Sequence, residues 1–447
     1  MKLFSYFRSG PEAPLRDLSE AQLHREYNWR RWEVFLGVMF GYGFFYVARV
    51  NLSVIKKPLL DEGIFTPTQL GAAGSAMLAV YAVGKLMNGI LADRAWIGRF
   101  MGFSLLGAAA INLALGFNTS FLVLLVLWGL NGWFLSAGSA PSVVALSQWF
   151  SPKEMGTRYG VWSCSHSIGE GLTFVFTSLL VAGLGWRMGF FGPALVCSVA
   201  ALLLMRFVHD RPRTLGLPAV EDYKQDHSAK AKPQGSVAAM QKVALRSPAV
   251  WLLGLASANM YVARYGLNNW GVLFLQESKG YDLASAGVVM GLCPMAGLLG
   301  GMAGGWVSDR FFAARRQWPC FLMGAGQVAA LLLVWWLPPG VVWLDGAAMV
   351  FFGFNMGGLI VFLGGLWAVD LVPAKAAGAA MGLVGCFSYM GAAFQDLVSG
   401  MLLEGGGHGV PYDFDALFAF WLGASVLSLV LTTALGFGRP LLARIRG

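Results

Sequence analysis

Apolar runs recur along nearly the whole 447-residue chain, separated by short breaks that carry charge, glycine or proline. A helix that crosses the hydrocarbon core of a bilayer needs roughly 20 apolar residues, and twelve runs come close to that length or exceed it. Open strands are excluded for such runs, because each unpaired backbone group in lipid costs several kcal/mol. The pattern therefore predicts an all-α integral membrane protein with twelve transmembrane helices. These helices are expected near residues 32–54, 68–92, 98–117, 121–148, 157–184, 187–208, 248–275, 284–308, 318–337, 341–369, 376–402 and 414–437.

Polar segments divide this pattern into two groups of six helices. Residues 1–31 are rich in arginine and lack the apolar region and cleavage site of a signal peptide, so we expect a cytoplasmic tail. Residues 209–247 have the composition of a linker. This linker separates an N-terminal half, 32–208, from a C-terminal half, 248–437, and residues 438–447 form a second expected cytoplasmic tail.

The balance of charges supports this division and predicts an orientation. Charged residues make up 12% of the chain, against about 25% in soluble domains. The net charge of +9 by itself suggests a nucleic-acid partner. However, most lysines and arginines lie in the segments expected in the cytoplasm, and those expected to face outward are Lys56, Lys57, Arg187 and Lys279. This is the positive-inside pattern, which predicts cytoplasmic termini and argues against nucleic-acid binding.

The two halves repeat each other at a nearly constant spacing. The repeated features are Gly89-Ile-Leu-Ala-Asp93-Arg94 and Gly305-Trp-Val-Ser-Asp309-Arg310, Arg49 and Arg264, and Gly156, Gly160, Cys164 and Gly169 with Gly378, Gly382, Cys386 and Gly391, preceded by Pro152 and Pro373. A constant spacing over three regions indicates a duplicated six-helix unit. Parallel halves related by an axis along the membrane normal are the major facilitator architecture. That fold of two pseudo-symmetric halves predicts a substrate site near the midplane and alternating access by rocking of one half against the other.

The repeated G-x-x-x-D-R motif fits the short cytoplasmic loops after the second and eighth helices. Its charged members are Asp93, Arg94, Asp309 and Arg310. The aspartates could cap their helices or pair with loop arginines such as Arg99 or Arg315. Such pairs could hold the cytoplasmic side shut in one state and release it in the other. The alternative is that the arginines only set the orientation of the chain.

Three basic residues, Arg49, Lys85 and Arg264, lie deep within predicted helices. A basic residue at a helix centre costs about 2.5–3.5 kcal/mol on insertion scales. Arg49 and Arg264 stand at equivalent depth in the first helix of each half, where both would face the central cavity. Lys85 precedes Asp93 by eight residues, which places it about 12 Å into its helix.

Two explanations for these buried cations remain open. The first is ion pairing with an intramembrane acid, but only Glu170 and Asp396 are available, so at most two of the three cations can be neutralised. The second is a shared anionic ligand, because guanidinium groups bind phosphate or carboxylate oxygens in a bidentate way. Glu170 could pair with His166 or Lys85, and Asp396 with an arginine of the empty state, or either acid could carry a coupling proton.

His166 and a group of aromatic residues are further candidates for the site. His166 could bond a neighbouring helix, donate to phosphate or change its charge near pH 6.5. The aromatic residues near the arginines are Tyr42, Tyr46, Tyr261, Tyr265 and Trp270, which could line the site or pack against other helices. Gly84-Lys85 is followed by Leu86, so no phosphate-binding loop of an ATP-driven pump is present. With no nucleophile–base arrangement and no metal-binding cysteine spacing, we expect neither an enzyme nor a cofactor.

The chain resembles the organophosphate:phosphate antiporter family of the major facilitator superfamily, which includes hexose-phosphate and glycerol-3-phosphate transporters and a related hexose-phosphate sensor. The resemblance is carried by residues 35–49, 81–94, 162–171, 210–218, 262–271, 304–310 and 376–392. It implies that Arg49 and Arg264 bind phosphate and that Lys85 and His166 assist them. It also implies a protein of the bacterial inner membrane that exchanges a phosphorylated small molecule for inorganic phosphate by a rocker-switch motion. Because a pathway between the halves of one chain needs no second subunit, we expect a monomer.

Two departures from the family pattern keep other functions open. Family members usually have lysine after the first arginine, where this chain has Val50, and a glycine-rich run after the histidine, where it has Glu170. Both changes make the cavity less positive. They leave room for a receptor that binds a sugar phosphate and signals to a membrane histidine kinase, or for proton-coupled symport of another organic anion.

Overall fold

The computed structural model describes residues 6–226, 242, 245–313, 315–372, 376–405 and 412–437. Pro373, residues 227–241 and 243–244 of the predicted linker, and the predicted tail 438–447 lie outside the described residues. The long elements of the N-terminal half are α2 (Glu20–Asp61), α3 (Pro67–Ala92), α4 (Ile97–Leu115), α5 (Phe121–Leu135), α6 (Ser139–Trp149), α7 (Pro152–Leu184) and α8 (Met188–Phe207). Those of the C-terminal half are α11 (Pro248–Glu277), α12 (Leu283–Phe311), α13 (Gln317–Trp336), α14 (Val342–Val361), α15 (Trp367–Leu371), α16 (Ala377–Glu404) and α17 (Phe414–Phe437). A 3-10 helix (Pro212–Leu215) and α9 (Val220–Lys224) follow α8, and a π-helix (Phe362–Leu366) joins α14 to α15.

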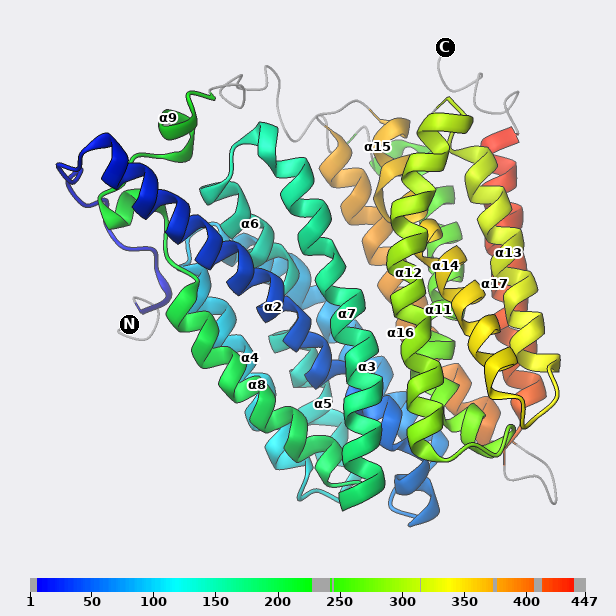
Figure 1. Ribbon diagram of the computed structural model, residues 1–447. Helices are drawn as coiled ribbons and strands as arrows, with labels where there is room; N and C mark the ends of the chain where they lie inside the picture. The colour runs from blue at the N-terminus through cyan, green and yellow to red at the C-terminus, as the bar shows by residue number, and fades with distance from the viewer. Residues whose placement is uncertain are drawn as a thin grey trace.

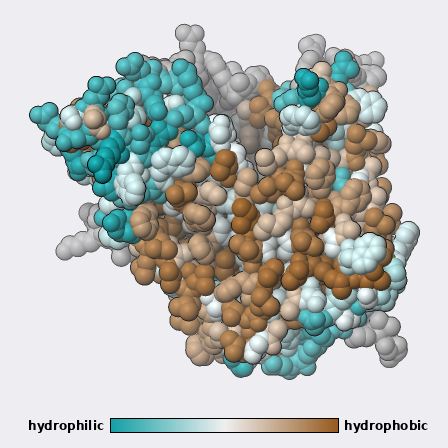
Figure 2. All heavy atoms as spheres, in the orientation of Figure 1, coloured by the Kyte–Doolittle hydropathy of each residue, from teal (hydrophilic) through white to brown (hydrophobic). Residues whose placement is uncertain are grey.

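These elements confirm the predicted twelve helices. Within the described residues, eleven segments are long and apolar enough to cross a membrane, with α5 and α6 forming one segment and α14 to α15 another. The twelfth is α11, which is less apolar because it carries polar residues such as Asn259, Arg264 and Asn268. An apolar band crosses the middle of the visible face, with polar surface above and below it (Figure 2). This distribution matches a helical bundle that spans a bilayer.

Local sequence signals set where several helices begin. Ser19, Thr66 and Ser151 each form a capping box at the start of α2, α3 and α7, which satisfies backbone N–H groups that lack an intrahelical partner. Asp282 caps α12 by accepting a 2.9 Å hydrogen bond from the Ser285 backbone N–H, and this bond lowers the pKa of its carboxyl group. The first helix extends beyond the predicted 32–54 at both ends, and the cap at Ser19 sets its earlier start.

The internal repeat is also a repeat of helix packing. A Cβ placed on Gly169 of α7 would lie 2.4 Å from the carbonyl oxygen of Gly43 in α2. At the matching position, a Cβ on Gly391 of α16 would lie 2.4 Å from the carbonyl oxygen of Ala258 in α11. In each half, the fifth helix therefore packs backbone against backbone on the first helix. A glycine is needed at the contact because any side chain would collide with the opposite backbone. The halves stand side by side, α2 to α8 on the left and α11 to α17 on the right (Figure 1).

The two halves are in contact at one end of the bundle. α2 begins and α17 ends at the same end, at the top of Figure 1, which we call the terminus-bearing end; the opposite end is the far end. At the far end Lys57 forms an ion pair with Glu277, and Glu404 accepts hydrogen bonds from the Thr66 hydroxyl at 2.9 Å and the Thr68 backbone N–H at 3.0 Å. A Cβ on Gly74 would lie 1.7 Å from Asp396 Oδ2, so α3 and α16 meet closely there.

The terminus-bearing end is open between the halves. A Cβ added to Gly156 or Gly160 of α7, or to Gly378 or Gly382 of α16, would meet nothing within 4 Å. In the described part of the chain, the polar contacts between the halves lie at mid-depth or at the far end. The structure is therefore closed at the far end and accessible from the terminus-bearing end.

A buried ion pair joins the halves where the far end closes. Lys56, expected to face outward, is instead 2% exposed, because α2 continues through it to Asp61. Its ammonium group lies 3.7 Å from a carboxylate oxygen of Asp396 in α16 and 3.2 Å from the ring centre of Trp270 in α11. Asp396 also accepts hydrogen bonds from Trp270 Nε1 at 2.8 Å and Asn269 Nδ2 at 3.0 Å.

We expect Asp396→Asn to lower the stability of the detergent-purified protein by about 3–5 kcal/mol, because it leaves the Lys56 ammonium buried without a counter-charge. Thermal unfolding measures the change. The double variant Lys56→Met/Asp396→Asn is expected to recover most of the loss, since no unpaired charge remains.

Lys57→Met is the matched control, because Lys57 is 27% exposed in its pair with Glu277 and pairs of that kind contribute about 0–1 kcal/mol. If the stability losses of the single variants Lys56→Met and Asp396→Asn simply add in the double variant, the two charges do not interact.

Candidate functional site

A cavity of about 460 Å³ extends from mid-depth toward the terminus-bearing end, between α7 on one side and α12 and α14 on the other. Its polar lining comes from α7 and α11, namely Thr157, Ser163, His166, Ser167, Glu170, Arg264 and Asn268. The side chains from α12 and α14 are apolar or sulfur-containing, among them Met290, Cys293, Met302, Phe352, Met356 and Ile360. The cavity therefore has one polar wall and one apolar wall.

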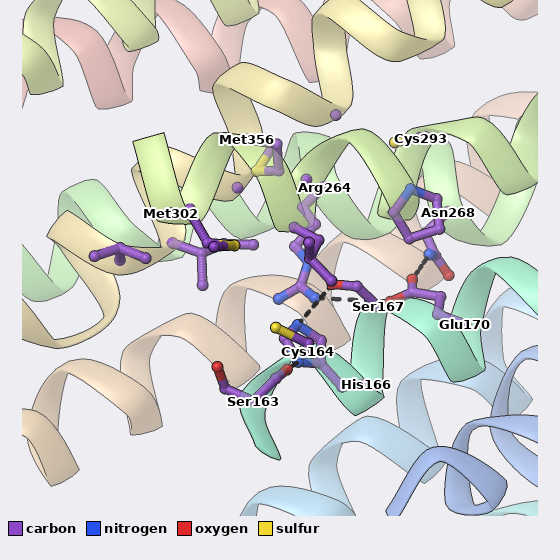
Figure 3. A pocket seen from close by; sticks show the side chains of 18 of the residues that line it. Ser163, Cys164, His166, Ser167, Glu170, Arg264, Asn268, Cys293, Met302 and Met356 are labelled. Atoms are coloured by element: carbon purple, nitrogen blue, oxygen red, sulfur yellow. Dashed lines mark hydrogen bonds and ion pairs between the residues drawn. The ribbon is translucent and has the colours of Figure 1, made fainter. Parts of the chain in front are cut away.

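Arg264 and Glu170 lie at the base of this cavity and point toward each other (Figure 3). Arg264 Nη2 is 4.0 Å from Glu170 Oε2, and the two side chains are 14% and 7% exposed. Glu170 also accepts a hydrogen bond from Asn268. The expected partners of Glu170 were His166 or Lys85, but the structure places it with Arg264 and Asn268 because α7 faces α11 at this depth. The long separation leaves most guanidinium donors of Arg264 without a carboxylate partner.

Arg49 is held by aromatic residues. It is 7% exposed, and its Nη2 donates a 2.6 Å hydrogen bond to the hydroxyl of Tyr265 in the other half. Its guanidinium carbon lies 4.5 Å from the ring centre of Tyr81, 5.4 Å from that of Tyr46 and 6.0 Å from that of Tyr389. Such contacts stabilise a cation by about 0.5–2 kcal/mol each. Among the described residues, no carboxylate forms an ion pair with Arg49.

Glu170 stands between the two arginines. It lines the large cavity that Arg264 borders, and it also lines a small void together with Arg49, Tyr46 and Tyr265. The structure thus brings together Arg49, Arg264, Glu170 and two of the predicted tyrosines. An anion that reaches this point from the terminus-bearing end would meet two guanidinium groups and one carboxylate.

Lys85 and His166 lie beside this group. Lys85 is exposed to the space between the halves, and its ammonium lies 5.3 Å from the ring centre of Tyr389. His166 Nδ1 bonds the carbonyl oxygen of Ser163, which requires a proton on that nitrogen. Its Nε2 is 3.3 Å from the Ser167 hydroxyl. The histidine is thus oriented by its own helix and not by an acid.

Besides Lys85, three of the predicted residues line neither the cavity nor the small void. Tyr42 stacks on Trp162 at a ring distance of 4.9 Å. Trp270 is fully buried and bonded to Asp396. Asp396 itself pairs with Lys56 and not with an arginine. Trp270 and Asp396 belong to the contact that closes the far end, whereas Tyr42 packs within the N-terminal half.

Sequence reasoning missed Tyr81 and Tyr389, which surround Arg49 and contact each other at a ring distance of 5.0 Å. Tyr81 precedes Lys85 by one helical turn in α3, so helical spacing from a predicted site residue could have identified it. Tyr389 follows the repeated Cys386, but its approach to Arg49 depends on how the halves meet.

The two G-x-x-x-D-R motifs lie in different surroundings. Asp309 Oδ1 accepts a 2.6 Å hydrogen bond from Arg316, which also donates to Asp370 at 3.0 Å. The partner is therefore Arg316, the residue just before α13, and not the expected Arg315. Asp93 and Arg94 are exposed, and the Asp93 carbonyl oxygen accepts a 2.5 Å bond from Arg211. Arg310 is exposed as well. Where the chain is described, neither motif bridges the halves, and a gating role stays a prediction.

Known proteins share this fold and much of this sequence. Residues 38–395 match the Major Facilitator Superfamily. A probable hexose phosphate transport protein of Chlamydia trachomatis is 30% identical, over 94% of this chain and 95% of its own length. The glycerol-3-phosphate transporter of Bacillus subtilis is 29% identical, over 96% and 97%, and the membrane sensor protein UhpC of Escherichia coli is 30% identical, over 87% and 90%.

The fold is also found in solved structures. A bacterial homologue of the human lysosomal transporter Spinster has a TM-score of 0.69 at 17% sequence identity, covering 91% of this chain and 96% of its own. The match to the superfamily spans most of the chain, so the predicted fold is confirmed and an enzyme is excluded. The chain belongs to the major facilitator superfamily and, within it, to the organophosphate:phosphate antiporter family.

Proposed function

We propose that this protein exchanges a phosphorylated small molecule for inorganic phosphate across the bacterial inner membrane, as a monomer with cytoplasmic termini. The observation that carries the proposal is the pair of arginines, one from each half: Arg264 lines the cavity, Arg49 lines the small void next to it, and Glu170 borders both. The names of the relatives, which include hexose phosphate and glycerol-3-phosphate transporters, support the same substrate class.

The chemistry of the two arginines fits a phosphate better than a structural ion pair. Arg49 has a tyrosine hydroxyl as its hydrogen-bond partner, and Arg264 lies at the outer limit of an ion pair with Glu170. Both cations are permanent, and a guanidinium presents two parallel donors to a phosphate. Lys85 adds a third positive charge in the space between the halves. A phosphate, with a charge of about −1.5 to −2, would balance most of this positive charge.

Alternating access gives the exchange its mechanism. With the orientation that the basic residues predict, the open end faces the cytoplasm, and the closed far end faces outward. Rocking of one half against the other would separate Lys56 from Asp396 and Lys57 from Glu277, while the open α7 and α16 faces would meet. The arginines would remain at the pivot and face each side of the membrane in turn.

A receptor is the second candidate function, because a sensor protein is as identical in sequence to this chain as a transporter is, at 30%. In that case the same pocket would bind a sugar phosphate, and a partner sensor kinase would read the conformation. Binding without flux would distinguish the receptor from the exchanger.

Vesicles that contain the purified protein and are loaded with phosphate are expected to take up labelled phosphate from outside. Arg49→Lys and Arg264→Lys are each expected to reduce this exchange at least about 100-fold, because lysine keeps the charge but loses the bidentate fork. Arg187→Lys, at the far end of α7 and α8, is the control and should exchange normally. Unchanged exchange in both site variants would remove the arginines from the mechanism.

Cys164 lines the cavity and is partly exposed, so its accessibility reports which end is open. In a Cys293→Ser/Cys386→Ser background, we expect a membrane-impermeant thiol reagent to label Cys164 rapidly from the side that carries the termini and at least about tenfold more slowly from the other side. The extent of labelling is measured by mass spectrometry, with the Cys164→Ser variant as the blank. Inorganic phosphate should slow the labelling of Cys164 by occupying the base of the cavity. Equal rates from both sides would contradict the closed far end.

A further inference from the structure

An acid lies inside a site that otherwise carries positive charge. Glu170 borders both the large cavity of Arg264 and the small void of Arg49. Its side chain is 7% exposed, and its hydrogen-bond partner is the neutral Asn268. Any ligand that binds both arginines must therefore lie next to this carboxylate.

A carboxylate at this position weakens the binding of a ligand that is only anionic. A phosphate held by Arg264 would lie on the order of 6 Å from Glu170, because the guanidinium is already 4.0 Å from the carboxylate. At an effective dielectric constant of about 20, two like unit charges at that distance reduce affinity roughly 100-fold. The site as built therefore discriminates against simple anions unless a positive charge accompanies them.

The cations of the site do not remove this effect. The Lys85 ammonium contacts the ring of Tyr389 and forms no ion pair with Glu170 among the described residues. His166 uses its ring nitrogens for Ser163 and Ser167 on its own helix. Arg264 reaches Glu170 only at 4.0 Å. The carboxylate thus keeps capacity for a further positively charged partner.

The surroundings of Glu170 suit an ammonium group. The rings of Tyr46 and Tyr265 already face the guanidinium groups of Arg49 and Arg264. An ammonium can instead approach the carboxylate from the 460 Å³ cavity, which Glu170 also lines. The apolar wall of α12 and α14 offers no competing polar group, so a carbon skeleton can rest against it while both charged ends face α7 and α11.

We propose that the substrate is a zwitterion, a phosphate monoester that also carries a protonated amine, such as an aminoalkyl or amino-sugar phosphate. Its phosphate binds Arg264 and Arg49, and its ammonium binds Glu170. This inference rests on the proposed function, because it assumes that the arginines hold a phosphate.

Two matched pairs of probes test the inference on the full-length protein in detergent. The members of each pair differ in one group, –NH₃⁺ or –OH: 2-aminoethyl phosphate with 2-hydroxyethyl phosphate, and glucosamine 6-phosphate with glucose 6-phosphate. Binding is measured by calorimetry, with inorganic phosphate as a fifth probe. We expect the amine member of at least one pair to bind at least about tenfold more tightly than its hydroxyl partner.

Glu170→Gln keeps the hydrogen bond to Asn268 possible and removes the charge. In this variant the preference for the amine should fall to about one, and the hydroxyl probes and phosphate should bind more tightly. Asp415→Asn, an exposed acid bonded to Trp335 at the far end, is the control and should keep the wild-type preference. The ratio in the wild-type protein tests the inference even if Glu170→Gln does not fold.

Two results would overturn the inference. If both members of each pair bind equally to the wild-type protein, no ammonium is recognised; a pH dependence of phosphate binding that disappears in Glu170→Gln would then assign the acid to proton coupling. If the amine preference survives in Glu170→Gln, another group recognises it. Failure of all five probes to bind would instead remove the proposed function itself.

Discussion

Two permanent positive charges near the middle of the bundle decide which side chains can surround them. Each basic side chain at that depth costs about 2.5–3.5 kcal/mol, and arginine cannot lose its proton to avoid the cost. Around Arg49 the protein supplies a ring of tyrosines and one hydroxyl. Around Arg264 it supplies a carboxylate that is close but not bonded. Neither arrangement satisfies a guanidinium fully, and a site of this kind retains affinity for an anion.

The duplicated helices position the two arginines. Residues that differ between the two halves set the charge of the site and close the far end. Gly169 and Gly391 seat equivalent helices in the two halves, so Arg49 and Arg264 reach equivalent depths. The residues that join the halves are not repeated: Glu170 corresponds to Ala392, and Asp396 corresponds to Phe174. Symmetry therefore sets the location of the site, and single asymmetric acids decide its charge and close the far end.

Features that depend on the local sequence pattern could be predicted from the sequence alone. Apolar runs predicted the twelve helices, and the repeat predicted two arginines at one depth. The surroundings of Lys56 were not predictable, because the charges at Lys56 and Lys57 resemble the end of a span and the acid that neutralises Lys56 lies in α16. The same reason applies to Tyr389 at Arg49 and to Asn268 at Glu170. Contacts between the halves depend on how the halves meet, which no local pattern records.

Coupling between the two directions of the proposed exchange follows from the same charges. Arg49 donates a hydrogen bond across the halves to Tyr265, and the positive charges of the site exceed its single carboxylate. Rocking of the empty protein would carry this excess charge through a closed, low-dielectric intermediate, where unbalanced charge is most costly. A bound phosphate offsets the excess and competes with Tyr265 for the donors of Arg49. In the proposed mechanism the loaded protein would therefore cross between its two states more readily than the unloaded one, and this difference in rate would couple the entry of one anion to the exit of another.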